Sequence, residues 1–190
     1  LIDMSHIGEK SFWDISAISN KPFIASHSSV YNLTPHFRNL KDDQILEIKK
    51  VEGLIGLNPY PFFIDSKFKK KEQEFLKNYK KELNEIRIKE SDLTTAWINK
   101  QHFLQTTLKD IVPSLDVFID HIEYVVNLIG IDYVGIGSDY DGLDCLPQGW
   151  KDCFDHIKIA EFLEKRGYTF LEIEKVMGNN LLRVIDSLAN

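Results

Sequence analysis

Cysteine is scarce in this sequence, and the two that occur, Cys145 and Cys153, are eight positions apart. This spacing allows a disulfide, but two thiols exclude a small fold held together by several disulfides and assign no compartment. No apolar run approaches the roughly 18–20 residues of a membrane-spanning helix, and no signal peptide is visible. We therefore expect this portion of the chain to be soluble. Because Leu1 lies inside an apolar segment without an initiator methionine, we interpret the sequence as part of a longer protein.

Positive charge is also in deficit, since 23 Lys and Arg stand against 29 Asp and Glu, for a net charge of −6. A nucleic-acid partner is therefore not expected, because phosphate binding needs a basic face. The lysines that cluster between residues 67 and 81 are interleaved with glutamates, which predicts a solvated helix face. A chain of 190 residues with 43% hydrophobic residues is long enough for one domain with a sizeable core.

Four short apolar segments predict buried parallel strands, because each is a nearly continuous run rather than an alternating pattern. They cover residues 1–5, 23–26, 54–58 and 133–137. Helical periodicity fills the intervals and predicts helices over 9–19, 42–51, 67–89, 116–129 and 180–188. Gly130 is expected to end the fourth of these helices, and Thr169 and Glu172 form a capping box before another. The fold class is therefore α/β, with a helical insertion at about 59–115 that includes a polar turn at 89–93.

Polar residues follow three of the four predicted strands. His6 and His27 come at the ends of the first two, and Asp139 follows the last. Carboxyl ends of parallel strands meet on one face, where barrel enzymes build their sites. Two imidazoles and a carboxylate converging there predict a bound divalent metal.

Several motifs together resemble a known family. They are Asp3-Met4-Ser5-His6, Ser26-His27-Ser28-Ser29, Arg38-Asn39-Leu40, Asp42 with Asp43, Gly137-Ser138-Asp139-Tyr140-Asp141-Gly142 and Asn179-Asn180-Leu181-Leu182-Arg183-Val184. In order and spacing they are similar to the membrane (renal-type) dipeptidases, zinc peptidases of the amidohydrolase superfamily. The resemblance implies a metal-dependent hydrolase (β/α)₈ TIM barrel. Residues 1–190 would supply its last four strand–helix units, with the missing N-terminal half as their partner.

The resemblance also implies roles for individual residues. His6 and His27 match the two histidines that hold the second zinc ion, and Asp139 matches the carboxylate that binds the first. Asp139 would also be catalytic, handling protons of the attacking water. Arg38 matches the arginine that grips the substrate carboxylate. The implied reaction is hydrolysis of dipeptides by a hydroxide bridging two zinc ions, although the family's remaining ligands belong to strands outside this chain.

The other candidate residues are assigned by position. Asn58 and Phe63 follow the third strand and are predicted to line the substrate pocket. Asp141 is interpreted as a turn residue. His121 has helical spacing from apolar neighbours and is predicted to be a half-buried structural histidine. Three further histidines have no partner motif and are predicted to be surface residues: His36, His102 and His156.

Two alternatives remain open. The first is another amidohydrolase activity on the same scaffold, such as hydrolysis of an N-acyl amino acid or a lactone. The second is a non-catalytic half-barrel remnant, which a reading frame encoding the missing ligands upstream of Leu1 would exclude. The sequence leaves the choice between zinc and other divalent ions open, and it leaves a homodimer open.

Overall fold

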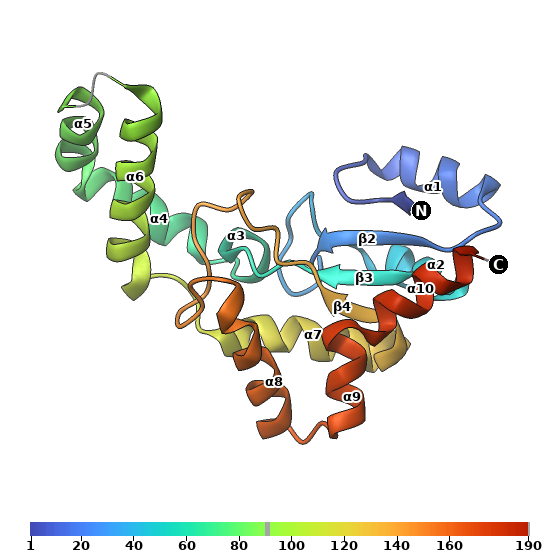
Figure 1. Ribbon diagram of the computed structural model, residues 1–190. Coiled ribbons are helices and arrows are strands. Elements are labelled where there is room, and N and C mark those ends of the chain that lie inside the picture. Colours follow the sequence, from blue (N-terminus) through green and yellow to red (C-terminus); the bar gives the residue numbers. More distant parts are fainter. Residues whose placement is uncertain (90–91, 190) are drawn as a thin grey trace.

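The computed structural model describes residues 1–89 and 92–189, and its centre is a sheet of parallel strands (Figure 1). The strands are β1 (Ile2–Asp3), β2 (Phe23–Ser28), β3 (Leu54–Leu57) and β4 (Val134–Ile136). Neighbours in the sheet follow the chain order, and each pair is parallel. The four predicted strands and the α/β class are thus confirmed. Because the strands run the same way, their carboxyl ends share one edge of the sheet.

The prediction that every strand is buried is wrong for β1. Both of its residues are exposed, whereas all four residues of β3 are buried. The reason is its place at the edge of the sheet, where it pairs with β2 through Ile2–Phe23 and Asp3–Ile24. No strand of the described ranges pairs with its other side, and such an edge leaves backbone N–H and C=O groups open to another chain.

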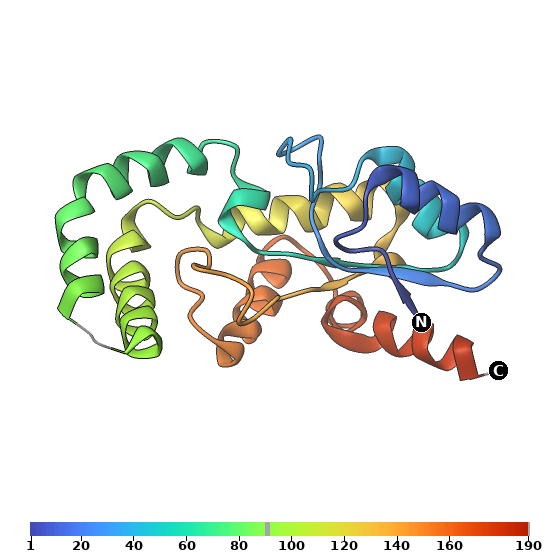
Figure 2. The same cartoon turned by 90° about the horizontal axis from the view of Figure 1, so that it is seen from above.

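Three predicted helices cover one face of the sheet (Figure 2). They are α1 (Glu9–Ile18), α2 (Asp42–Lys50) and α7 (Leu115–Ile129). Their apolar stripes pack on alternate strand residues, and the main core includes Phe12, Ala25, Ile45, Ile48, Ile55, Leu57, Phe118, Ile122, Val125 and Val134. The chain leaves α7 at Gly130, as predicted, because φ there is +99°, a conformation that favours glycine.

Between β3 and β4 the chain forms a helical arm that extends away from the sheet (Figures 1 and 2). Its elements are α3 (Pro61–Ile64), α4 (Phe68–Asn78), α5 (Lys80–Lys89), α6 (Leu93–Thr107) and the 3₁₀ turn Leu108–Asp110. The single helix predicted over 67–89 is broken at Tyr79, whose ring packs 4.5 Å from that of Phe75 and 5.7 Å from that of Phe103. The lysines of α4 and α5 are exposed, as predicted. The turn predicted at 89–93 includes residues 90 and 91, which lie outside the described residues.

The chain after β4 returns along the sheet. Its elements are the 3₁₀ turn Cys153–Asp155, α8 (His156–Lys165), α9 (Phe170–Glu174), the π-helical turn Lys175–Asn179 and α10 (Asn180–Ala189). The capping box of α9 is confirmed, because the Thr169 N–H donates to Glu172 Oε2 over 2.8 Å and Thr169 Oγ1 accepts from the Glu172 N–H. Sequence analysis missed α8, although Ile159 and Leu163, one turn apart, are its buried stripe.

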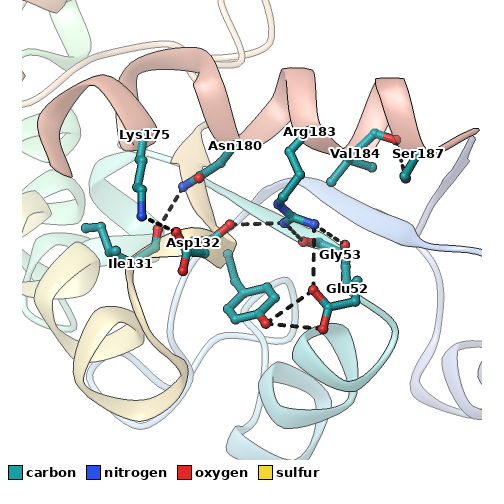
Figure 3. A network of polar contacts seen from close by, with 10 residues as sticks. Glu52, Gly53, Ile131, Asp132, Lys175, Asn180, Arg183, Val184 and Ser187 are labelled. Atoms are coloured by element: carbon teal, nitrogen blue, oxygen red, sulfur yellow. Dashed lines mark hydrogen bonds and ion pairs between the residues drawn. The ribbon is translucent and has the colours of Figure 1, made fainter. Parts of the chain in front are cut away.

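Helix α10 is fastened to the ends of the strands that lie opposite the carboxyl edge (Figure 3). Arg183 donates to the carbonyl oxygens of Glu52, Gly53 and Asp132, at 2.7 to 3.0 Å. Asn180 Nδ2 donates to the carbonyls of Ile131 and Val134, at 2.7 and 2.8 Å. Hydrogen bonds from a charged group contribute about 1.5–3 kcal/mol each. The Asn180–Arg183 part of the last motif is therefore structural in this fold.

Two expectations about single residues are corrected. His121 is structural, as predicted, but it is fully buried rather than half-buried. Its burial costs little because both ring nitrogens are paired: Nδ1 accepts from the Val30 N–H and Nε2 donates to the Ile64 carbonyl. Burial lowers the pKa of His121 to about 4, so the ring is neutral. Cys145 and Cys153 are both free thiols, so the disulfide that their spacing allows is not formed.

In the described ranges, no helix is both long and apolar enough to cross a membrane.

Candidate metal and substrate site

The structure brings three predicted site residues to the carboxyl edge of the sheet. The ring centroids of His6 and His27 lie 4.8 Å apart. Asp139 lies close enough to act electrostatically on the pKa of both His27 and Arg38. The convergence that strand-end positions predict is therefore present in the fold. The roles of these side chains as ligands stay a prediction.

The backbone at two of these positions adopts the left-handed conformation. φ is +70° at His6 and +52° at Asp139, a region in which a non-glycine residue costs about 1–3 kcal/mol. Asp141 has φ of +69° in a turn closed by a hydrogen bond from the Gly142 N–H to the Asp139 carbonyl, 3.0 Å long. That geometry agrees with Asp141 as a turn residue. A side chain at Gly142 would collide with Asp139 Oδ1, so glycine lets the carboxylate sit against the turn.

Two glycines allow the end of β4 to approach β2. A Cβ atom at either Gly56 or Gly137 would collide with the carbonyl oxygen of Ser26. The absence of side chains here lets the chain that follows β4 pass close to β2, and Asp139 is thereby carried towards His27. From the sequence, Gly137 and its neighbour Gly135 predict only a close approach of backbone or ligand, since the partner strand is not visible in the sequence.

A relay of hydrogen bonds orients the His27 ring. His27 Nδ1 lies 2.7 Å from Ser26 Oγ, which in turn donates its hydrogen to Asp3 Oδ2. Because the Ser26 proton is directed at Asp3, His27 Nδ1 must be the donor to Ser26, which leaves the lone pair on Nε2. His27 Nε2 is buried and has no hydrogen-bond partner in the described part of the chain. This is the form in which an imidazole binds a metal ion.

The charges around the site favour the same form of His27. Partial burial lowers its pKa below the usual value, Asp139 opposes this shift, and Arg38 and His6 add to it. The imidazole is therefore mostly neutral at pH 7. Burial raises the pKa of Asp3, but hydrogen bonds from the Ser26 side chain and from backbone N–H groups outweigh that effect and lower it. Asp3 is thus an ionised acceptor at the end of the relay.

The donor set fits part of a zinc-type site. Neutral imidazole and carboxylate are common ligands of that ion, and the orphaned Nε2 of His27 offers one coordination position. Across residues 1–89 and 92–189, no group of three or more His, Cys, Asp and Glu side chains is arranged to hold a metal ion by itself. The residues here therefore supply some ligands of a site, and others would have to come from elsewhere.

Arg38 lies beside the two histidines. Its Nη1 donates to His6 Nδ1 over 3.0 Å, and its Nη2 donates to the His27 carbonyl over 3.3 Å. Its guanidinium carbon lies 5.5 Å from the centre of the Phe63 ring. The guanidinium has five N–H donors, so these contacts leave others to bind an anion. Its position agrees with the predicted substrate contact.

Asn58 and Phe63 occupy different places. Asn58 is fully buried, donates from Nδ2 to Asp139 Oδ2 over 3.1 Å, and accepts the Tyr60 N–H at its Oδ1 over 2.8 Å. Asn58 therefore orients the Asp139 carboxylate and does not line the pocket beside Arg38. Phe63 lines a pocket next to Arg38 and His6, as the prediction for a pocket-lining residue requires.

Sequence analysis missed some residues of the site and misplaced others. Asp3 and Ser26 orient His27, and a signal was present, since each belongs to one of the strand-end motifs. His36 is not a simple surface residue, because its ring packs 4.7 Å from Phe63 in the pocket. His156 is half-buried too, stacked 5.6 Å from the Tyr140 ring. The prediction is correct for His102, which is exposed.

Comparison with known proteins defines the class. The sequence model of the membrane dipeptidases, peptidase family M19, matches residues 1–190. This chain belongs to that family. The fold is that of the family's metallopeptidases, so the four strands form part of a (β/α)₈ barrel.

Individual relatives show how much of such a protein the chain covers. It is 28% identical over 97% of its length to dipeptidase tcpJ of Claviceps purpurea, of which it covers 34%. An uncharacterized dipeptidase of Schizosaccharomyces pombe is 30% identical, with 97% of this chain and 35% of that one covered. The probable dipeptidase PvdM from Pseudomonas aeruginosa superposes with a TM-score of 0.73 at 26% identity, over 99% of this chain and 50% of that one. The chain therefore spans about a third to a half of these relatives.

Proposed function

We propose that this chain supplies part of the active site of a metal-dependent dipeptidase, and that further strands of a (β/α)₈ barrel complete it. The observation that carries the proposal is the buried, unpartnered Nε2 of His27, which lies beside His6 and near Asp139 at one edge of the sheet. The short coverage of the relatives and the unpaired side of β1 support the need for further strands.

His6, His27 and Asp139 would hold metal ions in this proposal. His27 offers a free Nε2 as it stands, whereas His6 could bind a metal ion only after Arg38 Nη1 releases its Nδ1, because a ring nitrogen that accepts this hydrogen leaves the other nitrogen protonated. When bound, two zinc ions would activate the attacking water and polarise the scissile carbonyl. The chain's own contribution is orientation. Asp3, through Ser26, fixes the tautomer of His27, and Asn58 holds Oδ2 of Asp139. Asp139 Oδ1 is then the atom that would take a proton from the attacking water and pass it to the leaving amine.

Dipeptides are the proposed substrate class. A metallopeptidase from Rhodobacter sphaeroides has been solved with a phosphinate mimic of the dipeptide L-Ala-D-Ala, and it superposes on 98% of this chain with a TM-score of 0.72 at 23% identity. Arg38 would bind the free carboxylate of such a substrate through two parallel hydrogen bonds. The alternative amidohydrolase activities would use the same ligands, so only a substrate panel separates them.

Metal analysis and a hydrolysis assay on the protein with its barrel complete test this proposal. We expect bound zinc and hydrolysis of simple dipeptides such as Ala-Ala, with no comparable hydrolysis of N-acyl amino acids or lactones. His27→Ala should remove one ligand and lower both the zinc content and the activity. His102→Ala is the matched control, because His102 is an exposed histidine of the arm. A metal-free protein, or one equally active after His27→Ala, would refute the proposal.

Arg38→Ala should mainly raise KM. Arg38 would grip a carboxylate remote from the scissile bond, and that contact is largely shared by the ground and transition states. We expect KM to rise by about 10- to 100-fold, equivalent to the roughly 1.5–3 kcal/mol of a charged hydrogen bond, with kcat changed much less. Steady-state kinetics on Ala-Ala would show this split, and Arg38→Lys should recover part of the loss. A fall in kcat alone would assign Arg38 to the chemical step.

A further inference from the structure

A pocket of about 400 Å³ opens next to Arg38 and His6. Its volume lies within the range of small-molecule sites. The segments that follow β1, β2 and β3 at the carboxyl edge build it, and the third includes α3. Apart from Arg38 and His6, aromatic rings line it: His36, Phe37, Tyr60, Phe62 and Phe63.

The rings form one continuous wall. Phe63 is buried and central, since its ring lies 4.7 Å from that of His36 and 5.1 Å from that of Tyr60. The Phe62 ring continues the wall 5.2 Å from that of Tyr60. The Arg38 guanidinium lies over the Phe63 ring, so the anion-binding group and the apolar wall are in direct contact.

Phe37 stands at the mouth of this pocket. It is 87% exposed, and its ring lies 4.5 Å from that of His36. A phenylalanine this exposed gains little from folding alone, but it gains apolar contact if a ligand enters the pocket. Its neighbour Arg38 would hold the carboxylate of the same ligand.

Charges of both signs lie near the pocket. Burial lowers the pKa of His36, and Arg38 and Lys69 add to that effect, whereas Asp139 acts on both Arg38 and Tyr60. A charged ligand side chain of either sign would lose hydration against the aromatic rings that line the pocket. An apolar side chain does not meet this penalty.

We propose that this aromatic pocket receives the side chain of the substrate's C-terminal residue and selects a bulky apolar or aromatic one. This rests on the proposed function, because Arg38 is taken to bind the adjacent carboxylate. Phe37 and Phe62 are then specificity-determining residues. Phe63 mainly supports Arg38, and its carbonyl accepts from Asn39 Nδ2 over 2.7 Å.

The experiment compares kcat/KM for Ala-Phe, Ala-Ala, Ala-Asp and Ala-Lys in the metal-loaded protein with its barrel complete. We expect Ala-Phe to exceed Ala-Ala by about 10- to 100-fold, the range that apolar pockets achieve, and Ala-Asp and Ala-Lys to fall below Ala-Phe. Phe37→Ala should reduce the ratio of kcat/KM for Ala-Phe to that for Ala-Ala about five-fold. Phe170→Ala is the matched control, because Phe170 is 74% exposed at the start of α9 and does not line the pocket.

A binding measurement adds a readout that does not depend on turnover. Free phenylalanine keeps both the carboxylate and the side chain, so calorimetry should show it binding at least about ten-fold tighter than alanine, and less tightly after Phe37→Ala. Equal hydrolysis of Ala-Phe and Ala-Ala, or a preference for Ala-Asp, would overturn the pocket assignment and leave the dipeptidase proposal standing. If no dipeptide is hydrolysed, both fail.

Discussion

Asp139→Asn is expected to lower kcat by about 10²- to 10⁴-fold, the usual contribution of a positioned acid–base group. The substitution keeps the size of the side chain and an oxygen that can accept from Asn58 Nδ2, but it removes the proton acceptor and weakens a metal ligand. Steady-state kinetics on a dipeptide, with zinc content measured in the same samples, would separate the two effects. KM should change much less than kcat.

Asp141→Asn is the matched control for this variant. Asp141 lies two residues further on, is exposed, and has a left-handed backbone that asparagine tolerates well. We expect its activity to stay within about two-fold of the parent protein. If Asp139→Asn kept near-normal kcat with its metal bound, the catalytic role of Asp139 would have to be abandoned, although the family membership would stand.

Residues 1–190 produced alone are expected to self-associate rather than remain a monomer of 22.1 kDa. The unpaired side of β1 offers backbone groups to another chain, and Leu1 and Ile2 beside it are exposed. On α10, Leu182 and Ile185 are exposed as well, and α10 and the N-terminus lie at the same end of the molecule in both views (Figures 1 and 2). The second face of the sheet contributes less exposed apolar surface for self-association, because Ile24 and Leu54 are buried against Val184.

Size-exclusion chromatography with light scattering would measure the mass of this segment. We expect dimers or larger species, and Ile2→Lys, which places a charge on the open edge, should shift them towards the monomer. Leu33→Lys is the control, because Leu33 is similarly exposed but lies in the loop after β2. A stable monomer with cooperative unfolding would contradict the expectation.

Local patterns were sufficient to predict most of the secondary structure. The apolar runs of β2, β3 and β4 and the stripe of α7 carry their own burial signal, and Gly130 and the Thr169–Glu172 capping box mark helix ends by local chemistry. The errors arose where a neighbour decides the outcome. β1 is exposed because it lies at the edge of the sheet, where the described ranges pair it only with β2.

The site residues divide in the same way, into those that local sequence identifies and those whose role depends on neighbours in the fold. The side chains at the strand ends could be identified from local sequence, because ligand type and strand periodicity are local properties of His6, His27 and Asp139. The folded contacts were needed to show that Ser26 and Asp3 set the tautomer of His27, that Asn58 binds Asp139 and does not line the pocket beside Arg38, and that His36 joins an aromatic wall there. Apart from the bond between the adjacent residues Ser26 and His27, these contacts join residues more than twenty positions apart, and hydrogen-bond direction and ring packing depend on the distances that folding creates.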